Sequence, residues 1–438
     1  MDVPADAARY LPRVSRAGAG LALSGGGFRA TLFHLGALRR LNEYGLLAGL
    51  DTIVGVSGGS IALAALAVGW PPPPASSGGR AAETGAGRGG ADAAAPAPIA
   101  DFDRRIAQPL RDFTARNIRS GPLFRGFLPW NLLRGRSNTD LLAAQYRRLT
   151  LGRQLPSLPV RPRFYFAATD LAFGVDWRFE RDRIGDYAAG HAAPHGANAD
   201  LSRAVAASSA FPPYFSPLRA RVSPRELHGG SVHPGPARDR DARGLRLADG
   251  GVYDNLGLEP IWRDHALLLV SDGGAPFAFA PDRGTWLSQI RRDVAVMANQ
   301  TTAVRKRWLI ASFLAGQMHG AYWGIASAAA HYQPGAPGYS ADLAANVIAA
   351  IRTDLDAFSP AEAAVLQNHG YSLADAALRS HLSNLLPAPL PPFAWPYPEW
   401  RDEAKVRAAL AKSWQQTVFG RPTYTPGPPH ARAASTQA

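Results

Sequence analysis

The fold is decided by residues 20–68, which read GLALSGGGFRATLFHLGALRRLNEYGLLAGLDTIVGVSGGSIALAALAV. Two short apolar runs, Gly20 to Ser24 and Thr52 to Val56, predict buried strands. A helical pattern follows each run, with leucines at every third position from Leu32 to Leu41 and an apolar stretch from Ile61 to Val68. The order strand, helix, strand, helix is typical of a parallel α/β sheet.

Three later apolar runs, at 164–168, 245–248 and 267–270, predict further strands of the same sheet. We expect the sheet to continue to about residue 275 and the chain to be helical beyond it. Ser359-Pro360-Ala361-Glu362 forms a capping box with proline at the first helical position, and its helix is expected to end near Asn368-His369-Gly370. The stretch from Pro71 to Pro98, rich in Pro, Gly, Ala and Ser, predicts a disordered insertion.

Composition limits the chemistry and the partners. Of the 438 residues 46% are hydrophobic and 18% charged, which is enough apolar surface for a large core. The absence of cysteine excludes disulfides, cysteine-ligated metal sites and a thiol nucleophile. The net charge of +13 would suit an anionic partner, but only three of the 47 basic residues are lysine, and the arginines are scattered without a nucleic-acid module. We therefore expect no nucleic-acid partner.

The N-terminus carries no basic region followed by an apolar one, so no secretory signal is visible. The expected location is the cytoplasm, with association to a membrane left open.

Gly55-Val56-Ser57-Gly58-Gly59 fits the pattern G-x-S-x-G between a predicted strand and a predicted helix. A serine in such a sharp turn exposes its hydroxyl at the carboxyl edge of the sheet, and the flanking small residues let strand and helix pack closely. This context favours Ser57 as a nucleophile over an ordinary strand-to-helix turn.

Three glycines, Gly25, Gly26 and Gly27, precede the first predicted helix. Backbone N–H groups at a helix N-terminus form a site for a negative oxygen. A phosphate loop is disfavoured because neither of the usual nucleotide-binding patterns is present. An oxyanion hole for acyl transfer fits better beside a serine elbow.

A nucleophilic serine also needs a base. Asp249-Gly250-Gly251 and Asp272-Gly273-Gly274 each follow a predicted strand, where α/β enzymes gather their functional groups. Spacing alone does not choose between Asp249 and Asp272.

The motifs at 25–29, 55–59 and 249–255 resemble, in order, the three motifs of the patatin-like phospholipase family, of the bacterial type. The likeness extends to 168–171, 207–212, 352–355 and 368–371, while Ala30 stands where the family usually has glycine. The resemblance implies a Ser–Asp dyad of Ser57 and Asp249, with the amides of Gly25, Gly26 and Gly27 as the oxyanion hole and with no metal or organic cofactor. Asp272 stays as the rival base.

A dyad needs no histidine, so we expect His34 to be a packed or surface side chain, and Arg29 to brace the glycine loop. Asp170 and Asp254 are expected to be caps or turn residues.

The fold class that follows is a patatin-like α/β protein, with a parallel-rich sheet flanked by helices and a helical C-terminal region. We expect a catalytic domain at 15–275 that contains the insertion 71–98, a helical region at 276–385, and a Pro-rich irregular tail at 386–438. The expected function is hydrolysis of fatty-acyl esters of lipids and phospholipids through an acyl-enzyme. A soluble-ester hydrolase, an acyltransferase, or an inactive membrane-binding protein of the same fold are the alternatives.

Residues 308–330 contain no charged side chain other than His319, and Ser312, Gly316, Gly320, Gly324 and Ala328 recur every four residues. A helix here would be a core helix, an interfacial or lid helix, or a membrane span. Arg305, Lys306 and Arg307 come just before it, where they could meet anionic head groups. The sequence thus predicts a lipid substrate and, if the interfacial interpretation holds, peripheral contact with an anionic membrane.

Overall fold

The computed structural model describes residues 16–72, 98–126, 128–133, 136–277, 285–415, 417–418 and 421–422. The predicted insertion, 71–98, falls almost wholly outside these residues.

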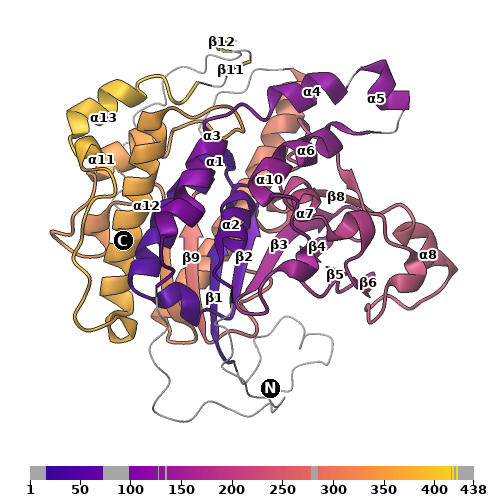
Figure 1. Cartoon of the computed structure of the whole chain (residues 1–438), viewed down its shortest axis with the longest axis horizontal. Coiled ribbons are helices and arrows are strands. Elements are labelled where there is room, and N and C mark those ends of the chain that lie inside the picture. Colours follow the sequence, from indigo (N-terminus) through magenta and orange to yellow (C-terminus); the bar gives the residue numbers. More distant parts are fainter. Residues whose placement is uncertain are drawn as a thin grey trace.

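A large mixed sheet runs through the middle of the molecule (Figure 1). Its strands follow the order β10, β9, β1, β2, β3, β4, β5, β6; those from β10 to β3 are parallel neighbours, and the pairs beyond β3 are antiparallel. The bounds are β1 Ala19–Leu23, β2 Thr52–Val56, β3 Arg163–Asp170, β4 Val175–Phe179, β5 Ile184–Asp186, β6 Gly190–Ala192, β7 Leu218–Arg219, β8 Arg246–Asp249, β9 Leu267–Asp272 and β10 His319–Gly324, with a separate pair β11 Thr417–Val418 and β12 Arg421–Pro422. The five predicted strands correspond to β1, β2, β3, β8 and β9.

Strand β3 is longer than its neighbour β2, and this difference in length lets it pair with a second strand, β8, beside the end of β2. Its first half pairs in parallel with β2, where Val56 lies opposite Ala167. Its last residues pair with β8, which runs antiparallel and places Asp249 opposite Ala168. The carboxyl ends of β2 and β8 therefore meet at adjacent positions of one template strand.

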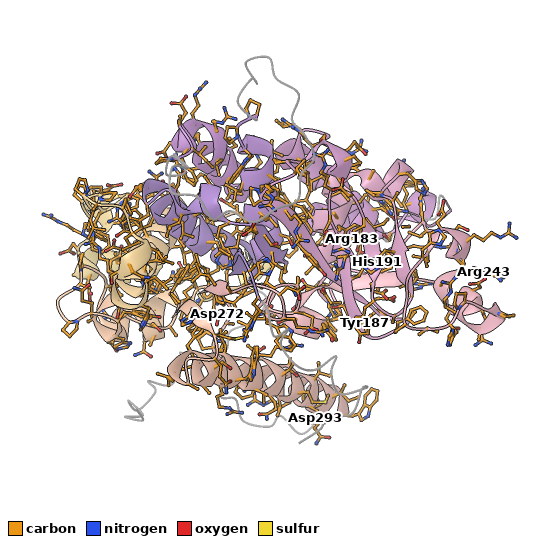
Figure 2. All side chains as sticks on the ribbon, turned by 90° about the horizontal axis from the view of Figure 1, so that it is seen from below. Arg183, Tyr187, His191, Arg243, Asp272 and Asp293 are labelled. Atoms are coloured by element: carbon orange, nitrogen blue, oxygen red, sulfur yellow. The ribbon has the colours of Figure 1, made fainter. Side chains whose placement is uncertain are left out.

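Helices cover both faces of the sheet. The helices of the N-terminal half of the chain, together with α12, lie over one face. Helix α10 lies over the other face and is the long helix at the bottom of Figure 2. Their bounds are α1 Gly27–Glu43, α2 Gly58–Gly69, α3 Gln108–Thr114, α4 Ser120–Gly126, α5 Pro129–Leu133, α6 Asn138–Thr150, α7 Leu201–Ser208, α8 Pro236–Ala242, α9 Gly251–Asp254, α10 Trp286–Leu314, α11 Ala341–Leu343, α12 Pro360–His381 and α13 Glu403–Leu410.

The helix α12 begins at the predicted capping box, in which Ser359 accepts from the Glu362 N–H and the Glu362 side chain accepts from the Ser359 N–H. The expected end near Gly370 is wrong, because α12 continues to His381. Gly370 marks a close contact instead: a Cβ there would lie 1.9 Å from the Phe33 carbonyl oxygen on α1. A Cβ at Gly36 would likewise lie 1.9 Å from the Gln367 carbonyl oxygen, so the two glycines let α1 and α12 touch backbone to backbone.

The expectation of one continuous helix over 308–330 is also wrong. Helix α10 ends at Leu314, Gly316 adopts a left-handed conformation (φ 66°), and the chain returns as β10, parallel to β9. Gly320 and Gly324 are strand residues, so the small residues at every fourth position form no helical ridge. Within the described residues, no helix is both long enough and apolar enough to cross a membrane.

Candidate active site

Ser57 occupies the turn between β2 and α2 with φ 51° and ψ −114°, a strained conformation for a residue with a side chain. The glycines around it are required by close packing. A Cβ at Gly58 would lie 2.2 Å from the Gly27 carbonyl oxygen, and one at Gly59 would lie 2.1 Å from the Leu23 carbonyl oxygen. The elbow is thus pressed against the glycine loop, and the Ser57 hydroxyl is left partly accessible.

Asp249 ends β8 beside this hydroxyl. The Ser57 Oγ donates a hydrogen bond of 2.7 Å to Asp249 Oδ2, and the Gly251 N–H donates one of 2.7 Å to Asp249 Oδ1. Burial raises the pKa of Asp249 to about 7, although both hydrogen bonds act in the opposite direction. The carboxyl group therefore changes its charge near neutral pH.

The glycine loop connects β1 to α1, and its N–H groups differ in whether they are hydrogen-bonded. The Gly25 N–H already donates to the Asn255 carbonyl oxygen (3.0 Å), and the Phe28 N–H donates to that of Asp354 (2.9 Å). Among the residues that the structure describes, no acceptor takes the N–H of Gly26 or Gly27. The N–H groups of Gly26 and Gly27 are thus available to a further acceptor, whereas that of Gly25 is already engaged.

Ser208, the last residue of α7, is hydrogen-bonded to the backbone at Ser57 and next to Asp249. Its Oγ accepts the Ser57 N–H (2.9 Å), and its carbonyl oxygen accepts the N–H of Gly250 (3.2 Å), the residue after Asp249. Ser60 donates its own proton to the Gly55 carbonyl oxygen (2.7 Å), so the Ser208 hydroxyl must donate to Ser60 Oγ (2.6 Å). This leaves a Ser208 lone pair facing the Ser57 N–H.

The two nearby basic side chains are buried structural groups. Arg29 donates to the carbonyl oxygens of Gly273, Ala349 and Ile351, and thus ties the glycine loop to the C-terminal part of the chain. His34 bonds the Ser24 carbonyl oxygen through Nε2 (2.9 Å) and Ser271 Oγ through Nδ1 (2.8 Å). Because a carbonyl can only accept, Nε2 carries the proton and Nδ1 accepts. Burial lowers the pKa of His34 to about 4, so the ring is neutral at pH 7.

Asp272, the rival base, has other partners. Its Oδ2 pairs with the Lys306 ammonium and accepts from the Tyr322 hydroxyl (2.8 Å), and its Oδ1 accepts from the Gly274 N–H (2.9 Å). Burial would raise the pKa of Asp272, but Lys306 and these hydrogen bonds bring it below its ordinary value. No contact joins Asp272 to Ser57 within the described residues.

Two of the three side chains of the basic run at 305–307 face carboxylates, and the third is exposed. Arg305 faces Glu259 (3.3 Å) and Asp254 (3.7 Å), and Lys306 faces Asp272, whereas Arg307 is exposed. Asp254 and Asp170 also act in turns, as expected: Asp254 accepts from the N–H of Leu256 and Glu259, and Asp170 accepts from that of Ala172.

Sequence reasoning missed the part that Ser208 plays. The stretch Ala207–Pro212 stood out only as part of a resemblance, and a hydroxyl that binds a backbone N–H 151 residues away leaves no mark in the spacing of residues. In the described part of the chain, no group of three or more His, Asp or Glu side chains is arranged to hold a metal ion.

The family model of the patatin-like phospholipases matches residues 21–262, more than half of the chain. The chain therefore belongs to the patatin-like phospholipase family, and its sheet with flanking helices is the patatin-like fold.

Among the solved structures that match are the two given below, and no curated protein sequence matches. VipD from Legionella pneumophila is 16% identical, over 84% of this chain and 68% of VipD, with a TM-score of 0.35. Human GIVD cytosolic phospholipase A2 is 12% identical, over 92% of this chain and 64% of the human one, with a TM-score of 0.44. This chain thus spans less than two thirds of the human structure, and similarities this low do not bear on activity.

Proposed function

We propose that this family member is a serine acyl hydrolase that cleaves fatty-acyl esters of lipids, phospholipids among them, with Ser57 as nucleophile and Asp249 as base. One observation carries the proposal: a partly accessible serine in a strained elbow donates a 2.7 Å hydrogen bond to a buried carboxylate. The family to which the chain belongs supports a lipid as the substrate.

In the first step, ionised Asp249 accepts the Ser57 proton while Ser57 Oγ attacks the carbonyl carbon of the ester. The N–H groups of Gly26 and Gly27 stabilise the negative oxygen of the tetrahedral intermediate. The carbon–oxygen bond to the alcohol then breaks, and the alcohol leaves with the proton from Asp249. Water repeats the sequence on the acyl-enzyme, and the fatty acid is released.

Asp249 must both take and return a proton, since the mechanism uses no imidazole. A carboxyl group with a pKa of about 7 is suited to this double task, because near neutral pH it is populated both as the ionised base and as the protonated acid. The cause of this raised pKa is the burial of the Asp249 side chain.

Two of the alternative functions would use the same acyl-enzyme, and the third, an inactive protein, would form none. An acyltransferase would differ only in the acceptor that replaces water, and a soluble-ester hydrolase only in the substrate. An inactive membrane-binding protein is disfavoured by the intact Ser57 and Asp249 contact. Contact of the basic run with anionic head groups is proposed for Arg307 alone, since Arg305 and Lys306 already face carboxylates.

The test is to label the protein with a fluorophosphonate and to measure the fatty acid it releases from a mixed lipid extract. Ser57→Ala should lose both labelling and release while its circular dichroism spectrum stays unchanged, because only a partly accessible hydroxyl is removed. Asp249→Asn should lose about a thousandfold in rate.

Asp272→Asn is the matched control, because it alters a buried carboxylate at the end of another strand of the same sheet. A smaller loss is expected there. Full activity in Ser57→Ala, or a larger loss in Asp272→Asn than in Asp249→Asn, would overturn the mechanism.

A further inference from the structure

Helix α10 extends past the edge of the sheet at which Ser57 lies. Lys306 pairs with Asp272 at the carboxyl end of β9, while Leu309 and Phe313, further along the helix, pack on the sheet face. The helix therefore runs opposite to the parallel strands, and the part before Arg305 continues beyond their carboxyl ends. Nineteen residues at ~1.5 Å each give a projection of about 28 Å, and Figure 1 shows this helix extending upward beyond the strands.

The projecting part carries a continuous apolar stripe. Its members recur at spacings of three or four residues and so lie on one side of the helix. All have exposed side chains, among them Val294 (54%) and Met297 (61%). The stripe, called the α10 stripe below, consists of Trp286, Ile290, Val294, Met297, Val304 and Trp308, with Thr301 between them.

The C-terminal end of the α10 stripe borders a groove lined by both apolar and polar side chains. Val304 and Trp308 line a cavity of about 710 Å³ whose other apolar residues are Leu258, Trp262 and Met318, and whose polar residues include Arg16, Glu259 and Arg305. The rings of Trp262 and Trp308 meet edge to face at 5.3 Å. Exposed apolar surface of this extent on one element marks a binding surface.

Charge indicates which surface the α10 stripe meets. The chain has a net charge of +13, and Arg307 on α10 is exposed, whereas Arg305 and Lys306 face carboxylates. Asp293 is labelled in Figure 2 on the side of the helix away from the body. A net positive charge beside an exposed apolar stripe is typical of elements that lie in the interface of an anionic bilayer.

We infer that the α10 stripe docks the protein on the surface of a bilayer that contains anionic lipid, and so keeps the Ser57 edge of the sheet close to its substrate. This inference rests on the proposed function for the identity of the substrate, but not for the docking itself.

The docking helix is tied directly to the site. Arg305 pairs with Asp254 and Glu259 and donates to the Tyr253 carbonyl oxygen (3.4 Å), and Tyr253 and Asp254 belong to α9, which begins two residues after Asp249. Lys306 pairs with Asp272, which Figure 2 places on the side of the sheet that faces α10. The α10 stripe is therefore anchored to the site by two ion-paired cations rather than by a loose linker.

The experiment uses the full chain and exploits its lack of cysteine, which gives any introduced cysteine a unique label. Val294→Cys and Val296→Cys form a matched pair: both valines are exposed (54% and 47%), but they lie on opposite sides of α10, about 160° apart. Each variant, in a Ser57→Ala background that leaves lipids intact, carries an environment-sensitive nitrobenzoxadiazole dye. Vesicles of phosphatidylcholine, with and without phosphatidylglycerol, are then added.

With phosphatidylglycerol present, the dye at position 294 should shift to the blue and brighten severalfold, whereas the dye at position 296 should change little. Replacing Ile290, Val294 and Met297 by Gln should lower vesicle partitioning by about tenfold or more. The same triple replacement, in the chain with Ser57 intact, should leave hydrolysis of a soluble short-chain ester unchanged. Vesicle binding by the Ser57→Ala chain stands whether or not the proposed chemistry is right.

Equal dye responses at positions 294 and 296, or unchanged partitioning of the triple variant, would overturn the docking surface. So would a wild-type dimer in solution that the triple variant converts to monomer without any loss of vesicle binding, since the α10 stripe would then be an interface between two copies. If the wild-type chain, which keeps Ser57, does not hydrolyse the soluble ester, that result would count against the proposed function but not against the docking surface.

Discussion

The carboxyl group of Asp249 lies in a buried position that sets its pKa to about 7, and this value predicts the pH dependence of the reaction. The base must be ionised, so kcat/KM should rise about tenfold per pH unit below pH 7 and level off above it. The measurement is a pH–rate profile with a soluble ester. A profile that is flat from pH 5 to pH 8 would remove Asp249 from the role of base.

Ser208 is the second residue whose contacts predict kinetics. Ser208→Ala removes the acceptor of the Ser57 N–H in a strained turn, and we expect kcat to fall by roughly ten- to a hundredfold with little change in KM, because the reacting hydroxyl loses its orientation. Ser208→Thr, which keeps the hydroxyl, should recover most of the rate.

The neighbouring Ser209 provides the control for Ser208. It is equally buried, but its hydroxyl bonds Tyr146 and the Val205 carbonyl oxygen rather than the elbow. Ser209→Ala should therefore change stability without the drop in kcat. Similar kcat values for the two alanine variants would show that Ser208 only supports the fold.

At the scale of elements, the contact between α1 and α12 depends on two glycines. Gly370→Ala should lower the free energy of unfolding by about 1–3 kcal/mol, because its Cβ would meet the Phe33 carbonyl oxygen and force the helices apart. Gly121→Ala in α4 is the control: a Cβ there meets nothing within 4 Å, and alanine favours the helix by up to about 1 kcal/mol. Urea denaturation compares the two variants, and equal effects would contradict the packing argument.

Local patterns predicted the elements whose signal lies within a few residues. The order β1, α1, β2, α2 and the capping box of α12 are of this kind. Strand β10 was missed because His319-Gly-Ala-Tyr-Trp-Gly324 has two glycines and no run of β-branched residues, and its place in the sheet depends on pairing with β9. Gly370 predicted a helix end because a glycine that permits close packing has the same letter as one that terminates a helix.

The residues of the candidate site also divide into those with a local sequence signal and those without one. The Ser57 elbow and the glycine loop are each contained in one short segment, so the sequence alone indicated them. The choice between Asp249 and Asp272 depends on the pairing of β8 with β3, and the engagement of the Gly25 N–H depends on Asn255, more than two hundred residues away. Contacts of that span are made by the folded sheet and leave no local pattern.

In the molecule as a whole, Val56 and Asp249 pair with adjacent residues of β3. The distance between Ser57 and Asp249 therefore does not depend on the length of chain that connects them. Ser57 and Asp249 are 192 residues apart in sequence, yet their distance is fixed by two neighbouring rungs of one strand. Segments between β3 and β8 that do not touch the elbow, such as the exposed turn around Gly235, can therefore lengthen or shorten without moving either group. Evolution could vary the outline of this protein widely while its chemistry stayed constant, and relatives that share the two groups need not share the interval between them.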